Sequence, residues 1–177
     1  MAVRFFIFFL LFVSTIALFM TINNDTNDTV KKDIALITFK ESTMYTINNE
    51  KVTRVVQSNK AVKYKTKDHI FNGTFILRAN SKNNEELTDI VSADFIEKRE
   101  SKVKFEKNVK YNRDDFISLS TDVLYYDLNT KIAYNDKPFI GKYYNNFLMG
   151  KKLYIYLTKS HFKSKKAHFE LNIKEKE

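Results

Sequence analysis

Apolar and charged residues alternate at every second position in several short stretches of this chain. In residues 102–106 (KVKFE), Val103 and Phe105 fall on one side, while the lysines and the glutamate fall on the other. Residues 62–67 (VKYKTK) and 117–120 (ISLS) repeat this pattern. Because successive side chains of a strand point to opposite faces of a sheet, the period of two predicts half-buried antiparallel strands.

Other short apolar stretches bring the expected total to about ten strands. They cover residues 34–39, 44–47, 53–57, 74–78, 123–128, 152–157 and 167–171. Turn residues separate the stretches at intervals of roughly 8–15 residues, which is typical of a sandwich, roll or barrel. The 177 residues include only one proline and three glycines, so most turns must use Asn and Asp, which tolerate left-handed backbone. We therefore expect an all-β domain over residues 33–177.

Residues 5–22 form an uncharged and mostly apolar segment, which Arg4 precedes. As an α-helix these 18 residues would extend roughly 27 Å, close to the ~30 Å hydrocarbon thickness of a bilayer. A cleaved signal peptide is the alternative, because residues 15–17 (TIA) are similar to a small-residue cleavage site. The apolar run continues through Met20, beyond that site, which favours a retained transmembrane anchor over residues 1–22.

The charges beside this segment predict its orientation. Arg4 and the amino terminus precede it, and short tails of this kind stay in the cytoplasm, so the bulk of the chain should lie outside. Residues 23–32 (NNDTNDTVKK) have nothing to bury and are expected to be a polar linker. The sequence has no cysteine, so the β domain must be stable without disulfides.

The net charge of +9 raises the question of an acidic partner, either lipid phosphates or nucleic acid. The regular alternation of lysines with apolar residues favours a simpler interpretation, a solvated outer face of the sheet. Nucleic acid is disfavoured, because the anchor would hold the domain outside the cytosol and no nucleic-acid-binding motif occurs.

The sequence contains no recognisable catalytic motif. The three histidines, His69, His161 and His168, lack the spacing of paired metal ligands on a strand. No nucleophile elbow, phosphate-binding loop or dinucleotide fingerprint is present in the 177 residues. We therefore expect a protein that is not an enzyme and that needs no cofactor or metal ion.

The order of these features resembles the LptC family, the bitopic periplasmic component of the lipopolysaccharide export machine. The resemblance covers about 140 of the 177 residues and is strongest at residues 91–95 (VSADF), 103–109 (VKFEKNV), 119–127 (LSTDVLYYD) and 150–156 (GKKLYIY). The third of these stretches contains the threonine-x-x-leucine-x-tyrosine element of the family. Where the family usually has a glycine just before the valine at position 109, this chain has Lys107 and Asn108.

The resemblance implies both a fold and a function. Members of the family are similar to an open twisted antiparallel β-jellyroll whose apolar interior shields acyl chains. The resemblance thus implies a single-pass inner-membrane protein whose periplasmic jellyroll receives lipopolysaccharide or lipooligosaccharide from an inner-membrane ABC transporter. It would pass this lipid to an LptA-like periplasmic jellyroll, because several acyl chains cannot cross water unless their apolar area stays covered.

On such a jellyroll, the residues on the inner faces of the strands are the expected lipid-binding residues. They are Val62, Tyr64, Phe75, Leu77, Val103, Phe105, Ile117, Leu119, Leu124, Tyr126, Leu153 and Ile155. For each of them the alternative is an ordinary place in the core of a closed sandwich. The alternative for the whole protein is a membrane-anchored β scaffold for envelope assembly that binds only protein partners.

Overall fold

The computed structural model describes residues 9, 11–16, 33–48, 51–80, 86–114, 116–159 and 161–171. The chain divides into two units, Met1–Asp33 and Ile34–Glu177. In the first unit, residues 9 and 11–16 are α-helical. No helix within the described ranges is both long enough and apolar enough to cross a membrane. Most of the predicted anchor, and all of the predicted linker over residues 23–32, lie outside the described residues, so both stay predictions.

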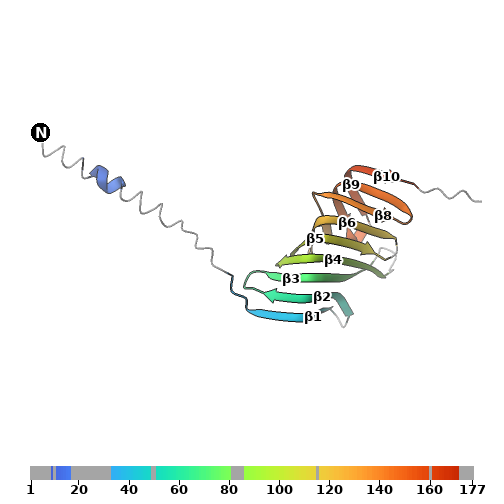
Figure 1. Ribbon diagram of the computed structural model, residues 1–177, viewed down its shortest axis with the longest axis horizontal. Helices are drawn as coiled ribbons and strands as arrows, with labels where there is room; N and C mark the ends of the chain where they lie inside the picture. The colour runs from blue at the N-terminus through green and yellow to red at the C-terminus, as the bar shows by residue number, and fades with distance from the viewer. Residues whose placement is uncertain are drawn as a thin grey trace, which may run out of the picture. The chain divides into compact units, whose positions relative to one another are not determined.

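The second unit is one antiparallel sheet of ten strands (Figure 1). The elements are β1 (Ile37–Asn48), β2 (Lys51–Lys63), β3 (Asp68–Asn80), β4 (Glu86–Arg99), β5 (Lys102–Arg113), β6 (Ile117–Asp127), β7 (Ile132–Tyr134), β8 (Pro138–Tyr143), β9 (Asn146–Tyr156), the 3₁₀ turn η1 (Leu157–Lys159) and β10 (His161–Glu170). Their spatial order is β1-β2-β3-β4-β5-β6-β7-β9-β10, and β8 pairs with both β6 and β9. The predicted all-β antiparallel fold is confirmed.

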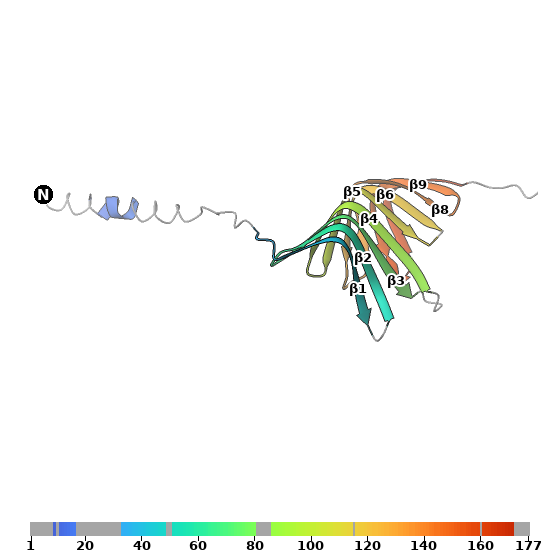
Figure 2. The ribbon, with the colours of Figure 1, turned by 60° about the horizontal axis from the view of Figure 1, so that its bottom comes forward.

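A row of polar residues crosses the sheet near the middle of the strands, and we call this row the crease. It comprises Glu41, Asn59, Asn72, Asp94, Lys107, Asn108, Asp122, Lys152 and Lys166, which the pairing registers place side by side. Six of them have left-handed backbone, with φ between 47° at Glu41 and 64° at Lys107. Figure 2 shows the consequence, because strands β1 to β5 arch rather than run straight.

The crease also shifts the alternation of side chains by one position. In β3, Ile70 and Phe75 are both buried although they are five residues apart, and the same holds for Leu119 and Leu124 in β6. Two residues five apart in a regular strand would point to opposite faces. Both halves of each bent strand therefore present their apolar residues to the same concave side of the sheet.

The two halves of the folded sheet pack against each other across one hydrophobic core. The rings of Phe75 on β3 and Phe105 on β5 meet edge-to-face with their centroids 5.3 Å apart, although these two strands are not paired. Phe105, Ile96 and Ile155 have no exposed surface. The fold is thus stabilised by contacts between halves as well as by the hydrogen bonds within the sheet.

A buried polar network closes one end of this core. The Arg113 guanidinium donates to both carboxylate oxygens of Asp89, at 2.7 and 2.9 Å, and also to the carbonyl of Leu157 at 3.3 Å. The Tyr111 hydroxyl donates to the same carboxylate at 2.6 Å. Burial raises the pKa of Tyr111 far above its usual range, so its hydroxyl stays a donor. The network joins β4 and β5 to η1, across the interior.

Several expected strand boundaries differ from the structure. The strand predicted over residues 62–67 is wrong beyond Lys63, because the Tyr64 amide donates to the Lys67 carbonyl at 2.8 Å and closes a turn. The stretches predicted separately at 117–120 and 123–128 form the single bent strand β6, and 34–39 and 44–47 are likewise joined in β1. Strands β4, β7 and β8 were not among the predicted stretches, since none of them shows a sustained alternation in the sequence.

The crease yields a stability prediction at Lys107, whose φ is 64°. A left-handed backbone conformation destabilises the folded state by roughly 1–2 kcal/mol for a residue other than glycine. Glycine avoids this strain, but its greater conformational freedom in the unfolded chain lowers the free energy of unfolding by roughly 0.5–1 kcal/mol. We expect Lys107→Gly to raise the free energy of unfolding by up to about 1 kcal/mol in urea titrations of the full chain. Lys110→Gly, in the extended part of the same strand, should lower it. A loss of stability in Lys107→Gly would contradict this account of the crease.

Candidate functional site

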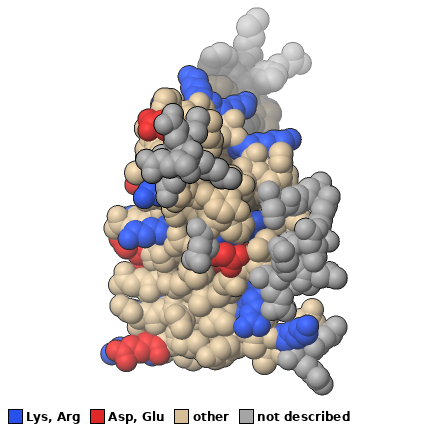
Figure 3. All heavy atoms as spheres, turned by 90° about the vertical axis from the view of Figure 1, so that its right-hand side faces the viewer, with Lys and Arg blue, Asp and Glu red and all other residues tan. Residues whose placement is uncertain are grey.

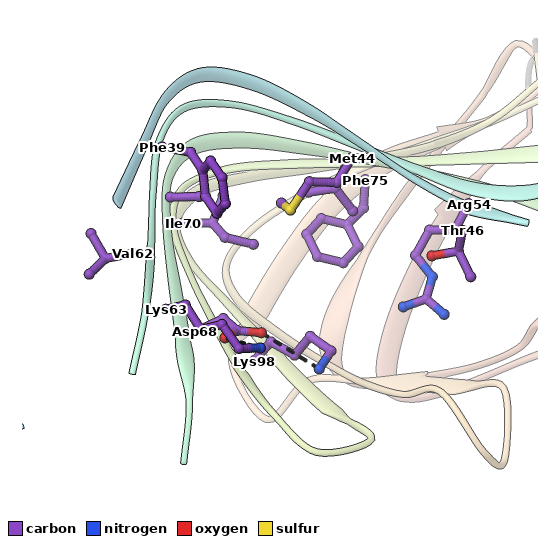
Figure 4. Close-up of a pocket in the computed structure, with 12 residues that line it drawn as sticks. Phe39, Met44, Thr46, Arg54, Val62, Lys63, Asp68, Ile70, Phe75 and Lys98 are labelled. Carbon is purple, nitrogen blue, oxygen red and sulfur yellow. Dashed lines mark ion pairs between the residues drawn. The ribbon is translucent and has the colours of Figure 1, made fainter. Parts of the chain in front are cut away.

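An apolar cavity of about 180 Å³ lies on the concave side of β1, β2 and β3. Its apolar wall is made by Phe39, Met44, Val56, Ala61, Ile70 and Phe75. Figure 4 shows Phe39, Met44, Ile70 and Phe75 pointing into a common space beneath the arch of the strands. Because β1 is an edge strand with almost every residue exposed, a single strand separates this part of the cavity from solvent.

Ion pairs border one side of the cavity. Asp68 lies between Lys63 and Lys98, with a carboxylate–ammonium distance of 3.7 Å to each, as the dashed lines of Figure 4 indicate. The three side chains are 30% to 57% exposed, so these pairs contribute little to stability. They give the apolar space a polar border at the β2–β3 turn.

A wider cleft of about 950 Å³ lies beside the opposite end of the cavity. One side of the cleft comes from the ends of β1 to β4 and the other from the turn after β6 and from η1. Thr46 and Arg54 line both spaces, so the cavity and the cleft adjoin each other at these two residues. The cleft contains four cationic residues, Lys51, Arg54, Arg78 and Lys131.

Two of these cations face the cleft from opposite halves of the sheet. Arg54 belongs to β2, and Lys131 precedes β7. Burial, together with the positive charge of Arg54, lowers the pKa of the Lys131 ammonium. Burial also raises the pKa of the Tyr126 phenol, which lines the same cleft, to about 12. Within the described part of the chain, neither Arg54 nor Lys131 forms an ion pair with a carboxylate.

Ten of the twelve predicted lipid-binding residues lie in the hydrophobic core. Phe75 lines the cavity, and Leu77 and Tyr126 line the cleft. The other seven line neither space and pack within the core: Val103, Phe105, Ile117, Leu119, Leu124, Leu153 and Ile155. Whether any of them contacts lipid stays a prediction.

Val62 and Tyr64 lie outside this core cluster. Val62 is buried and is one of the residues that line the cavity. Tyr64 follows the end of β2, and its ring packs edge-on against His69, with centroids 4.9 Å apart. The turn at residues 64–67 places Tyr64 outside the strand, so the predicted alternation ends before it.

The sequence prediction missed most residues of the cavity and the cleft. Phe39 and Met44 lie on either side of the crease in β1, so no single alternating pattern includes both. Arg54 and Lys131 come together only because the sheet folds, and no local pattern relates residues so far apart in the chain. The apolar composition of residues 34–47 was the available signal for the cavity wall.

Both outer strands of the sheet, β1 and β10, pair on one side only within the described residues. On β1, Tyr45 and Ile47 are 63% and 64% exposed, and on β10 Phe169 is 45% exposed. Unpaired strands of this kind present free amide and carbonyl groups to a neighbouring chain. The sheet is therefore open at both ends rather than closed into a barrel.

On the face shown in Figure 3, charged side chains are distributed rather than gathered in one place. On the face in Figure 3, Lys and Arg side chains form several separate patches with uncharged surface between them. A nucleic-acid-binding surface typically shows a continuous basic patch or stripe. In the described ranges, no three His, Asp or Glu side chains come together in a way that could hold a metal ion.

No protein-family model matches this chain, and a search of curated proteins finds no significant match. The structure has an apolar cavity, a cationic cleft beside it, and two open sheet edges within the described residues. An apolar space next to cations fits a molecule that has both an acyl chain and an anionic group.

Proposed function

We propose that this protein is a membrane-anchored lipid carrier of the LptC type, with an open β-jellyroll in the periplasm. In this proposal the jellyroll receives lipopolysaccharide or lipooligosaccharide from an inner-membrane ABC transporter and passes it to an LptA-like periplasmic jellyroll. The observation that carries the proposal is the apolar cavity that adjoins a cationic cleft between the two halves of the sheet.

The cavity suits part of an acyl chain. Most of its wall is apolar, and apolar cavities of ~150 Å³ remain dry and take up molecules such as benzene. A volume of about 180 Å³ therefore holds only a short segment of one chain. A lipid with several acyl chains would also have to occupy the cleft, and β1 would have to move outward as it enters. Because β1 is exposed and pairs only with β2 within the described residues, this movement disrupts a single strand pairing.

The open edges suit strand addition by protein partners. An extended segment of another chain can bind an unpaired strand through backbone hydrogen bonds. Docking of a transporter subunit at one edge and of an LptA-like jellyroll at the other would align the apolar interiors into one path. Residues 1–22, as a single-pass anchor in the inner membrane, would hold the jellyroll next to the transporter.

A membrane-anchored scaffold that binds only proteins is the second candidate. The exposed Tyr45 and Ile47 on β1 favour it, because apolar side chains at an unpaired edge are typical of strand-addition sites. The scaffold uses the same edges but leaves the cavity without a role, so the occupant of the cavity distinguishes the two functions.

Photocrosslinking from within the cavity tests the lipid-carrier proposal. We expect a photoactivatable amino acid at Met44, which lines the cavity and is 37% exposed, to crosslink to labelled lipopolysaccharide in cells. The same amino acid at Ile140, which is 54% exposed on β8 and lines neither the cavity nor the cleft, is the matched control. Crosslinks from Met44 to proteins alone would refute lipid transport and support the scaffold.

A further inference from the structure

We propose that Arg54 and Lys131 form a binding site for the anionic group of an amphiphile whose acyl chain occupies the adjoining cavity. The ligand class is a long-chain molecule that ends in a carboxylate or phosphate. This inference rests on the proposed function and specifies which part of the lipid is recognised and by which residues.

The first support is the position of the two cations. Arg54 lines both the apolar cavity and the cleft, and Figure 4 shows it beside Thr46 at the end of the cavity. Lys131 faces the same cleft from the other half of the sheet. A ligand whose chain lies against Met44 and Phe75 would therefore have its polar end next to Arg54.

The second support is the lack of a counter-charge for this pair in the described part of the protein. Asp89 lines the cleft, but its carboxylate already accepts hydrogen bonds from Arg113 and Tyr111. Asp127, just before the turn that holds Lys131, accepts the backbone amides of residues 129 and 130, at 2.8 and 3.2 Å. The two cations thus repel each other in a partly buried place, and the lowered pKa of Lys131 is one sign of this repulsion. An anion between them would remove that repulsion.

The third support is the chemistry of the two side chains. A guanidinium presents a planar fork of donors that matches both carboxylate and phosphate, and an ammonium adds a point charge. Free phosphate has the same anionic chemistry as a lipid headgroup. The position of the cationic cleft next to an apolar cavity favours the amphiphile, because a free ion would gain nothing from the apolar wall.

The test uses the full chain in nanodiscs of zwitterionic phosphatidylcholine. The reagents are a 16-carbon fatty acid with a diazirine near its methyl end and the corresponding alcohol with the same diazirine. After irradiation, mass spectrometry quantifies the adducts on the segments that contain Met44 and Phe75. We compare the unmodified protein with Arg54→Gln, Lys131→Gln, the double variant, and Lys142→Gln on β8 as a charge-matched control.

We expect the fatty acid to label the cavity at least tenfold more than the alcohol. Labelling by the fatty acid should fall three- to tenfold in each single variant and further in the double variant. Labelling by the alcohol should be the same in all variants, and Lys142→Gln should label like the unmodified protein. Inorganic phosphate should reduce the labelling no more than chloride of equal ionic strength. Strong competition by phosphate alone would instead indicate a site for the free ion and overturn the amphiphile assignment.

Two other outcomes separate this inference from the function on which it rests. Equal labelling by acid and alcohol, unchanged in the double variant, would overturn the anion site and leave lipid binding intact. No cavity labelling by either reagent in the unmodified protein would overturn both the lipid-carrier function and the anion site.

Discussion

Replacing Phe105 with aspartate is expected to unfold the β domain rather than merely to empty it of lipid. The Phe105 side chain has no exposed surface and packs against Phe75 in the centre of the core. Truncation of such a phenylalanine to alanine costs about 3–5 kcal/mol, and an ionised carboxylate without a partner adds to this loss. The total is comparable to the whole stability of a typical domain, about 5–15 kcal/mol.

Phe39→Asp is the matched comparison. Phe39 lines the cavity on edge strand β1 and is 45% exposed, so an aspartate there can reach water. We expect this variant to keep the circular dichroism spectrum and the urea midpoint of the unmodified protein but to lose lipid crosslinking from Met44. If Phe105→Asp folded normally and lost only lipid, the interior would be a wide lipid cavity and not a packed core.

Replacing Arg113 with methionine should give the second large loss of stability. The substitution leaves the Asp89 carboxylate buried, with Tyr111 as its one remaining partner among those described, and removes the bond to the Leu157 carbonyl. Breaking a buried ion pair on one side costs about 3–5 kcal/mol, because the remaining charge stays desolvated. Urea unfolding of the full chain, followed by circular dichroism, measures this change.

Two further variants show whether the loss comes from the unpaired charge. Lys104→Met breaks the exposed pair with Glu106, whose atoms are 2.8 Å apart, and should cost about 1 kcal/mol or less. The double variant Asp89→Leu, Arg113→Met removes both charges. It should recover much of the free energy of unfolding that Arg113→Met loses, because apolar residues can often replace a buried ion pair. A double variant as unstable as Arg113→Met would show that the hydrogen bonds, and not the unpaired charge, hold this end of the fold.

These predictions divide the interior into two regions with different tasks. The region around Phe105, Leu124 and Ile155 is densely packed and stabilises the fold. The region behind β1, next to Met44 and Phe39, retains unfilled space and adjoins the cationic cleft. We therefore propose that ligand binds at the β1 end of the sheet, whereas the sequence prediction distributed the lipid-binding residues over β2, β3, β5, β6 and β9.

The fold class follows from short-range patterns. In β5 the alternation of Val103 and Phe105 with lysines and a glutamate predicts both a strand and its buried face, and the structure agrees. The same reasoning fails at the crease of β3 and β6, because the alternation of buried side chains shifts there by one position. Thus β6 was predicted as two strands, although Leu119 and Leu124 belong to one. Lys107 and Asn108, at the place where the LptC family usually has glycine, both adopt the left-handed backbone that glycine adopts most easily.

By itself, the sequence determined that short alternating stretches, such as residues 102–106, form strands with an apolar and a charged face, because alternation is a property of neighbours in the chain. Only the tertiary structure decided which apolar residues fill a core and which surround a space. That distinction depends on how the sheet bends along the crease and how closely its two halves approach. Arg54 and Lys131 line one cleft for the same reason, since contacts between the two halves of the sheet bring together residues that no local pattern relates.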